Sequence, residues 1–311
     1  MILTVTMNPC IDRYVETDSL TVGGTNRIDL GNDVAGGKGI NVARVLKSMG
    51  KEPLCTGLSF TDGSEVLTEA LYNAGIAEDM VTVKGKLRVN LKIRDKNGVT
   101  TEINQTGECP DGKAVYAVID KIIKYAPMAE AVVLSGSLPK GVAPCFYGDI
   151  IRELNEHGVI TVLDTGGQAL KDGIPASPRL LKPNYDEITA MAGVTSATAE
   201  ELARIAAGLC REHGVGMVSV SLGGEGAVIT DGNTAFLAKN AEVDVVCTTG
   251  AGDAMVAAQT FALCRGFDMD QVLRLGMAAG NAWVAKPAGD ELDYRLMRSL
   301  MGKINIERIN L

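Results

Sequence analysis

The residue types best suited to chemistry lie together at residues 248–253, where a strand-like segment runs into a helix-like one. The stretch reads Thr-Thr-Gly-Ala-Gly-Asp and is followed by a helix-like run of Ala, Met and Val. Free N–H groups at a helix start converge, and the helix dipole adds positive potential, so this turn could bind a phosphate. Gly250, Ala251 and Gly252 would supply the N–H groups, and Asp253 could act as a general base. Alternatively, Asp253 only caps the helix and balances its dipole.

A second glycine-rich segment, residues 35–44, leads into an amphipathic helix-like run. Its loop, with Gly36 and Gly37, could present N–H groups to sugar hydroxyls. Lys38 and Asn41 would then face the same pocket. The other interpretation is a tight turn before an ordinary helix, with Lys38 in solvent, and the sequence favours neither.

Three further polar loops follow strand-like runs, at residues 135–141, 182–187 and 221–226. In an open parallel sheet, ligands gather at the carboxyl ends of the strands. Asn184 and Glu187 would share a helix face and could orient water around Mg²⁺, although a capping box explains the same spacing. The third loop suits the ribose or phosphates of a nucleotide, or it is a plain hairpin turn.

A recurring pattern predicts the elements that position these loops. Amphipathic runs at 45–49, 151–157 and 202–213 each end at a glycine, and a short apolar run follows each glycine. Such a glycine fits the left-handed position that ends a helix. Apolar runs with few polar residues are typical of strands buried on both faces, so the pattern predicts a parallel sheet covered by helices.

Two segments break this pattern, residues 10–34 and 86–107. Both contain charged, alternating stretches, and the second has a turn rich in Asn and Gly, which is typical of a half-exposed hairpin. We expect them to form an antiparallel lid on the main sheet.

The composition limits the function. The net charge is −8 and no basic block occurs, which argues against a nucleic-acid-binding protein. No apolar run approaches the ~18 residues of a membrane span, and the first residues read as a strand rather than a signal peptide. Seven cysteines without a C-x-x-C pair indicate a reducing, cytoplasmic location.

His157 and His213 precede helix-ending glycines, which argues against a Ser-His-Asp hydrolase or a histidine-ligated metal enzyme. Trp283 lies in an apolar stretch and is expected in the core.

Taken together, these motifs resemble the ribokinase-like carbohydrate kinases, known as the PfkB family. Residues 6–12 are similar to the opening of that family, 36–41 to its first signature and 248–256 to its second. Asn184 and Glu187 match its Mg²⁺-associated motif. The resemblance covers essentially the whole chain. It implies an α/β, ribokinase-like three-layer fold with a central, mostly parallel sheet and a small antiparallel β lid, built as a single domain over residues 1–311.

The resemblance also implies an activity. Asn8-Pro9, Lys38, residues 88–90 and residues 135–141 resemble the branch that acts on sugar phosphates. The expected reaction is ATP-dependent phosphorylation of fructose 1-phosphate to fructose 1,6-bisphosphate with Mg²⁺. Alternatives are tagatose 6-phosphate, another sugar or nucleoside, or a catalytically silent sugar-phosphate sensor. Two departures from the family pattern are visible: Leu87 stands where Thr is usual, and Cys10 stands where a small residue is usual. Neither touches the chemistry.

The family roles carry over to these residues. The substrate would be bound by Asp12, Arg27, Gly36, Gly37, Lys38, Asn41, Arg88 and Ser137. The nucleotide would be bound by Asn184, Ser221, Gly223, Gly224, Gly226 and Asn281. Glu187 would hold the metal through water, and Asp253 would be the catalytic base. The family's habit of pairing lids implies a homodimer in which Arg27 comes from the partner subunit.

Overall fold

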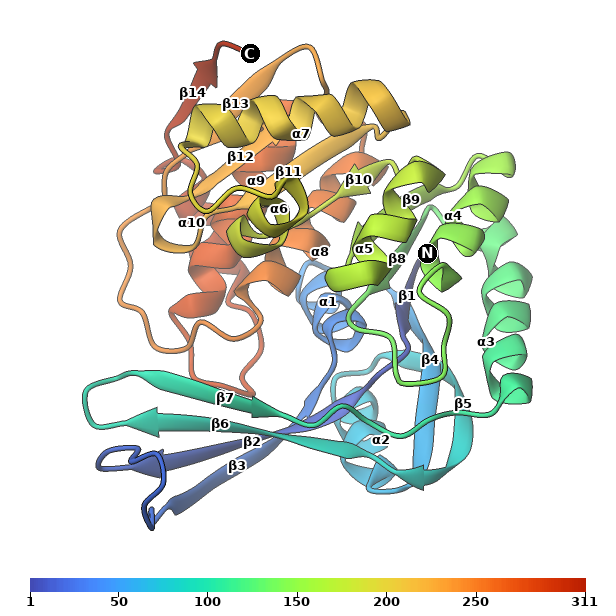
Figure 1. Cartoon of the computed structure of the whole chain (residues 1–311), viewed down its shortest axis with the longest axis vertical. Helices are drawn as coiled ribbons and strands as arrows, with labels where there is room; N and C mark the ends of the chain where they lie inside the picture. The colour runs from blue at the N-terminus through green and yellow to red at the C-terminus, as the bar shows by residue number, and fades with distance from the viewer.

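The computed structural model describes residues 1–311 and contains two β-sheets, of ten and four strands. The strands of the larger sheet are β1 (Ile2–Thr6), β4 (Pro53–Asp62), β5 (Ala77–Lys86), β8 (Ala131–Ser135), β9 (Ile160–Asp164), β10 (Leu180–Leu181), β11 (Met217–Ser221), β12 (Ala227–Thr230), β13 (Ala235–Ala238) and β14 (Ile306–Ile309). Their order is β14-β13-β12-β11-β10-β9-β8-β1-β4-β5 (Figure 1). The strands from β11 to β5 are parallel, and β12, β13 and β14 add an antiparallel edge, so the mostly parallel sheet is confirmed.

Helices cover both faces of this sheet, which confirms the three-layer prediction. One face carries α3 (Gly112–Tyr125), α4 (Phe146–Glu156), α5 (Gly167–Gly173), α6 (Tyr185–Ala192) and α7 (Ala199–His213). The other face carries α1 (Lys38–Ser48), α2 (Ser64–Asn73), α8 (Ala251–Cys264), α9 (Met269–Val284) and α10 (Tyr294–Met301). Short 3₁₀ turns lie at Ala126–Met128, Ile174–Ala176 and Gly223–Glu225. None of the helices combines the length and the apolar character needed to cross a bilayer.

Alternation along the strands supplies a core to each face. Leu3 and Val5 of β1 belong to a cluster of 38 buried residues, whereas Ile2 belongs to a second cluster of 34 on the opposite face. Successive strand residues point to opposite faces, so a strand that is apolar throughout is buried on both sides. This is why the predicted strands read as nearly unbroken apolar runs.

The three predicted helix-ending glycines have the expected backbone. Gly50, Gly158 and Gly214 have φ of 77°, 69° and 69°. A side chain is strained in this left-handed region, so glycine ends each helix and turns the chain into the next strand.

The smaller sheet is the predicted lid. It contains β2 (Cys10–Thr17), β3 (Asp29–Gly36), β6 (Arg88–Asp95) and β7 (Thr100–Asn104), in the order β3-β2-β6-β7, and extends away from the main sheet (Figure 1). Its two hairpins are antiparallel as expected, but the inner strands β2 and β6 pair in parallel. The reason is topological: β2 continues from β1 and β6 from β5, and β1 and β5 run in the same direction in the main sheet.

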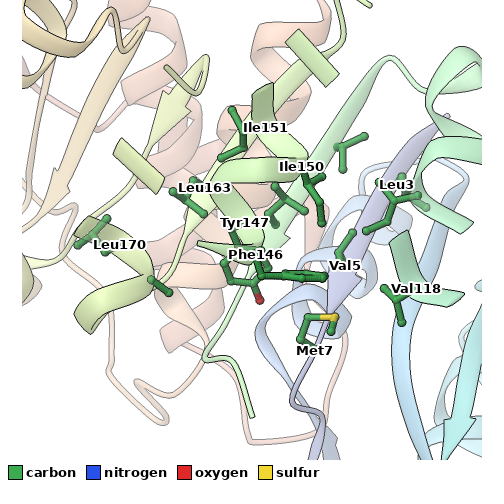
Figure 2. Packing of buried hydrophobic residues seen from close by; sticks show 14 of the residues in the cluster. Leu3, Val5, Met7, Val118, Phe146, Tyr147, Ile150, Ile151, Leu163 and Leu170 are labelled. Atoms are coloured by element: carbon green, nitrogen blue, oxygen red, sulfur yellow. The ribbon is translucent and has the colours of Figure 1, made fainter. Parts of the chain in front are cut away.

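One core residue anchors a predicted site loop. Figure 2 shows Phe146 and Tyr147 of α4 packed near Val5 and Met7, and the two aromatic rings meet edge to face with centroids 5.6 Å apart. The buried Tyr147 hydroxyl donates to the carbonyl oxygen of Gly136 at 3.1 Å. This bond ties the loop after β8 to the core.

Candidate active site

Five neighbouring strands deliver polar side chains to one edge of the main sheet. Asp164 and Ser221 are the last residues of β9 and β11, Lys182 directly follows β10, and Asn8 and Ser137 lie two residues beyond β1 and β8. Because these strands are parallel and adjacent, their carboxyl ends meet at the same edge.

A cavity of about 610 Å³ lies at this edge and contains a concentration of positive charge. Among the predicted substrate residues, Lys38, Arg88 and Ser137 line it, and Lys140 joins them. Glu187 is its only acidic lining residue. A chain of net charge −8 therefore carries a local cationic site that suits a phosphorylated ligand.

Arg88 is held rigidly in this cavity. Its guanidinium donates to the backbone oxygen of Asn8 at 2.9 Å, to the backbone oxygen of Gln105 at 2.9 Å and to Asn90 Oδ1 at 3.1 Å. The Asn8 amide in turn donates to Ser137 Oγ at 3.1 Å. These bonds fix the lid against the loop after β8 and present Arg88 beside Ser137.

A second cavity of about 720 Å³ gathers the predicted nucleotide residues. All six line it: Asn184, Ser221, Gly223, Gly224, Gly226 and Asn281. Ala251 and Gly252 of the glycine turn border the same space. At Gly226, with φ of 109°, an added Cβ would lie 2.0 Å from the Ala238 carbonyl oxygen, so the chain needs glycine there.

The glycine turn starts α8 as predicted, and Trp283 supports it. Gly250 is the N-cap residue with φ of 89°, and an added Cβ would lie 2.8 Å from Trp283 Nε1. Trp283 is buried as expected, and its Nε1 donates to the Thr249 carbonyl oxygen at 2.7 Å. The N–H groups of Gly250 and Gly252 have no acceptor in the protein, whereas that of Ala251 donates to the Thr248 carbonyl oxygen at 3.2 Å. Two of the three predicted N–H groups are therefore free to bind an anion.

Asp253, in the first turn of α8, is buried among polar groups rather than hydrocarbon. Asn41 Nδ2 donates to its Oδ2 at 2.7 Å. Burial raises the pKa of Asp253 to about 6, against the opposing effects of Lys38, Asn41 and Lys182. A carboxylate with a pKa near neutrality can accept a proton at physiological pH, which is what a general base requires. Its neighbours border both cavities, since Lys38 lines the first and Gly252 the second.

Lys38 and Asn41, from the start of α1, each contact an acidic residue. Asn41 bonds Asp253 directly. Lys38 Nζ lies 3.0 Å from Oδ1 of the fully buried Asp164, while the Lys38 side chain is 37% exposed, so the lysine is paired and still reaches the first cavity. Burial disfavours the charge of Lys38, but Asp164, Asp253 and Glu187 hold its pKa above the usual value.

The remaining predicted substrate residues divide into two groups. Gly36 lies against Asp12, because an added Cβ would come 2.5 Å from Asp12 Oδ2, and Asn90 Nδ2 donates to Asp12 Oδ1 at 2.9 Å. Gly37, with φ of 126°, is the N-cap of α1. Asp12, Gly36 and Gly37 line neither cavity. Arg27 also lines neither cavity and is exposed in the loop between β2 and β3. Within one chain the structure does not bring Arg27 to the site.

Asn184 and Glu187 form a capping box at the start of α6, which is the alternative explanation that the sequence offers for their spacing. Glu187 Oε2 accepts the Asn184 N–H at 2.9 Å, and Asn184 Oδ1 accepts the Glu187 N–H at 2.8 Å. The other carboxylate oxygen, Oε1, faces Gly166, where an added Cβ would lie 2.7 Å away. No cluster of three or more metal-ligating side chains is present. One free carboxylate oxygen suits Mg²⁺, which keeps most of its waters and shares substrate phosphates.

Unpartnered polar atoms also mark this site. Six buried side-chain oxygens have no hydrogen-bond partner, and five of them belong to the strand ends or to the second cavity, the exception being Gln259 Oε1. The strand-end atoms are Thr6 Oγ1, Asn8 Oδ1, Ser135 Oγ and Asp164 Oδ2, and the atom at the second cavity is Asn281 Oδ1. Native proteins leave few such atoms, so their concentration here indicates a site for a polar ligand.

Sequence reasoning gave no role to Asp164, Lys182 or Lys140. Asp164 directly follows the apolar run at 159–163, and the rule that ligands gather at strand ends could have identified it. Lys182 follows a strand of only two residues, which is too short to show a periodic pattern. Lys140 lies in the polar loop 135–141, and the sequence indicates that loop without distinguishing its individual residues.

Comparisons with known proteins agree with this geometry. The profile of the pfkB family of carbohydrate kinases matches residues 5–292. The chain is 31% identical over 310 residues to the 1-phosphofructokinase of Escherichia coli K12, covering 99% of each. It is 30% identical over 312 residues to that of Bacillus subtilis 168, covering 99% of this chain and 100% of the relative. A solved structure of a possible 1-phosphofructokinase from Thermotoga maritima matches with a TM-score of 0.90 at 25% identity and covers 100% of both chains.

Proposed function

Because the chain belongs to the pfkB family of carbohydrate kinases, we propose that it transfers the γ-phosphoryl group of ATP to fructose 1-phosphate and forms fructose 1,6-bisphosphate. Its relatives named 1-phosphofructokinase support a sugar phosphate as the acceptor. One observation carries the proposal: the buried carboxylate of Asp253 lies at a glycine turn that borders the cavity of the predicted nucleotide residues, and its charged neighbour Lys38 lines the cation-lined cavity.

The transfer needs a base, an aligned acceptor and stabilisation of spreading negative charge. The acceptor hydroxyl gives its proton to Asp253, and its oxygen forms a bond to the γ-phosphorus. The bond from that phosphorus to the bridging oxygen breaks, and its electron pair leaves with ADP. The free N–H groups of Gly250 and Gly252 stabilise the charge on the equatorial oxygens. The phosphate already on the sugar binds at Arg88 and Ser137.

Glu187 is the residue that would hold Mg²⁺, through water, because its Oε1 is left free by the capping box. When bound, the ion neutralises charge on the ATP phosphates. The residues present therefore fit an ion that arrives with the nucleotide. We also propose a cytoplasmic location, on the basis of the seven free cysteines.

A panel of acceptors tests the function. ADP release is measured with ATP, Mg²⁺ and fructose 1-phosphate, fructose 6-phosphate, tagatose 6-phosphate, fructose or a nucleoside. We expect the highest kcat/KM with fructose 1-phosphate and little turnover of the unphosphorylated acceptors. Preference for tagatose 6-phosphate would reassign the sugar within the same reaction. Tight sugar-phosphate binding without ADP release from any acceptor would instead indicate a silent sensor.

The raised pKa of Asp253 predicts an acid limit to activity. Its carboxylate must be unprotonated to accept a proton, so activity is lost as the pH falls through about 6. The measurement is kcat at saturating substrates, because a sugar phosphate itself titrates near pH ~6 and would distort kcat/KM. At pH values below the pKa of Asp253, kcat should fall about tenfold for each pH unit. A constant kcat down to pH ~4.5 would contradict a base with this pKa.

The lid also supports the proposal of a homodimer. Six large apolar side chains of the lid are exposed: Leu20, Val22, Ile28, Leu30, Val99 and Ile103. Val22 is 96% and Leu30 75% exposed, and a concentration of exposed apolar side chains on one small sheet is typical of an interaction surface. A second lid would cover them and would bring Arg27 near the partner's site.

The dimer is tested by light scattering after size exclusion. The parent protein is expected at twice the chain mass, and Leu30→Lys at a lower mass because a charge enters the covered surface. Tyr72→Lys is the matched control, since Tyr72 is 82% exposed but lies on α2, outside the lid. A parent protein that stays monomeric at every concentration would refute lid pairing.

A further inference from the structure

Lys182 is a buried cation to which the proposed mechanism gives no task. Its side chain is 3% exposed, and its ammonium lies 3.3 Å from Asp164 Oδ1. The same nitrogen lies 3.5 Å from the position that a Cβ on Gly252 would occupy. Burying an ammonium is costly unless it is paired, so a lysine beneath the glycine turn requires an explanation.

Asp164 pairs with two lysines through one oxygen. Lys38 reaches Asp164 Oδ1 from the start of α1, and Lys182 reaches it from the end of β10. The second oxygen, Oδ2, has no partner. Although burial would raise the pKa of Asp164, Lys182 and Lys38 hold it below the usual range. The ammonium groups of Lys38 and Lys182 thus share the single carboxylate of Asp164. These three side chains together keep one net positive charge beside Asp253.

Both ammonium groups keep donors for a ligand. An ammonium has three N–H donors, and Asp164 is the only acceptor of Lys38 and the only ion-pair partner of Lys182 in the structure. Lys38 borders the first cavity, while Lys182 lies at the turn that borders the second. A phosphoryl group passing from one cavity to the other would travel between them.

We propose that Lys182 is a catalytic residue that contacts the phosphoryl group during its transfer, and that Asp164 is the positioning residue that holds Lys182 and Lys38 on either side of that group. This inference rests on the proposed phosphoryl transfer. It moves Lys38 from the phosphate already on the sugar to the phosphate being transferred. Asp164 acts through the lysines and does not touch substrate.

The first test is the kcat of Lys182→Met, a neutral side chain of similar length. We expect kcat to fall about 10²-fold, the scale for one lost charge-stabilising donor, while the KM for the sugar phosphate changes by less than about threefold. Lys182→Arg should recover part of this loss because it restores the charge. Lys51→Met is the matched control, since Lys51 pairs with Glu130 at 3.2 Å away from either cavity and its loss should leave kcat unchanged.

The second test uses the acid limb of kcat. The charged or polar groups that face Asp253 are Lys38 and Asn41 from α1, Asp164 from β9 and Lys182 after β10. Lys182 lowers the pKa of Asp253 and Asp164 raises it. The limb should therefore move to higher pH in Lys182→Met and to lower pH in Asp164→Asn. A purely structural defect would not move the two variants in opposite directions.

Folding of each variant is checked by circular dichroism, and Lys182→Gln serves if the methionine variant does not fold. A folded Lys182 variant with the parent's kcat, or limbs that shift in the same direction, would overturn the inference. Neither result would affect the kinase assignment, which rests on the parent's own turnover of the acceptor panel.

Discussion

Asp253→Asn is expected to lower kcat by at least about 10²-fold, because it removes the proposed base and leaves the surrounding geometry in place. Asparagine has nearly the same shape as aspartate, and its Oδ1 can still accept the bond that Asn41 now donates at 2.7 Å. The KM values for ATP and for the sugar phosphate should therefore change little. Initial rates over a matrix of both substrates measure kcat and the two KM values separately.

The same substitution should stabilise the protein, which gives a second readout. The folded-state pKa of Asp253, about 6, lies above the ordinary 3.8, so folding disfavours its charged form. The free-energy cost of this buried charge is absent at pH values below the ordinary pKa. It is fully present at pH values above the pKa of the folded state. Two pKa units correspond to roughly 3 kcal/mol as an upper bound. Tm should rise by a few degrees at pH ~8 and by less at pH ~5.

Asp270→Asn is the control for the simpler interpretation of Asp253 as a helix cap. Asp270 also lies in the first turn of a helix, α9, but lines neither cavity. Losing its charge should cost a few tenths of a kcal/mol of helix-dipole stabilisation and leave kcat intact. If Asp253→Asn behaved like this control, with activity close to the parent's, the base would have to be another group.

Gly250→Ala should also reduce kcat by about 10²-fold, because it displaces the N–H groups that we propose bind the transferring phosphate. The new Cβ would lie 2.8 Å from Trp283 Nε1, at a residue whose φ of 89° already disfavours a side chain. Removing this steric clash requires a movement of the Trp283 ring or of the glycine turn. Either movement strains the 2.7 Å hydrogen bond from Trp283 to Thr249. Steady-state kinetics together with urea unfolding would measure both effects.

Gly266→Ala separates backbone strain from the steric contact. Gly266 has φ of 69°, lies just past the end of the same helix and has nothing within 4 Å of an added Cβ. It should cost about 1 kcal/mol of stability with no change in kcat. Equal kcat for the Gly250 and Gly266 variants would show that the turn does not contribute to transfer.

The sequence located much of this site because strand ends and glycine turns are local features. Asn184 and Ser221 lie in separate loops that the sequence indicates, Asn281 of α9 follows only from the family resemblance, and the fold brings the three to one cavity. The parallel pairing of β2 with β6 could not be seen, since it depends on the directions of β1 and β5 in the folded sheet. The link from Lys38 to Asp164 was missed for a related reason: the two residues are 126 positions apart, and no local pattern predicts such a pair.

The glycine turn borders the second cavity and carries Asp253, whose neighbour Lys38 lines the first, and this proximity has a consequence for inhibitor chemistry. A synthetic molecule that joins an adenosine analogue to a sugar phosphate through a short linker could occupy both spaces at once. Joining the two halves makes the second contact intramolecular and raises its effective concentration, often to the millimolar range. Its selectivity would come from the anionic end, because only an enzyme with cations such as Arg88 and Lys140 in the acceptor cavity would gain from that group.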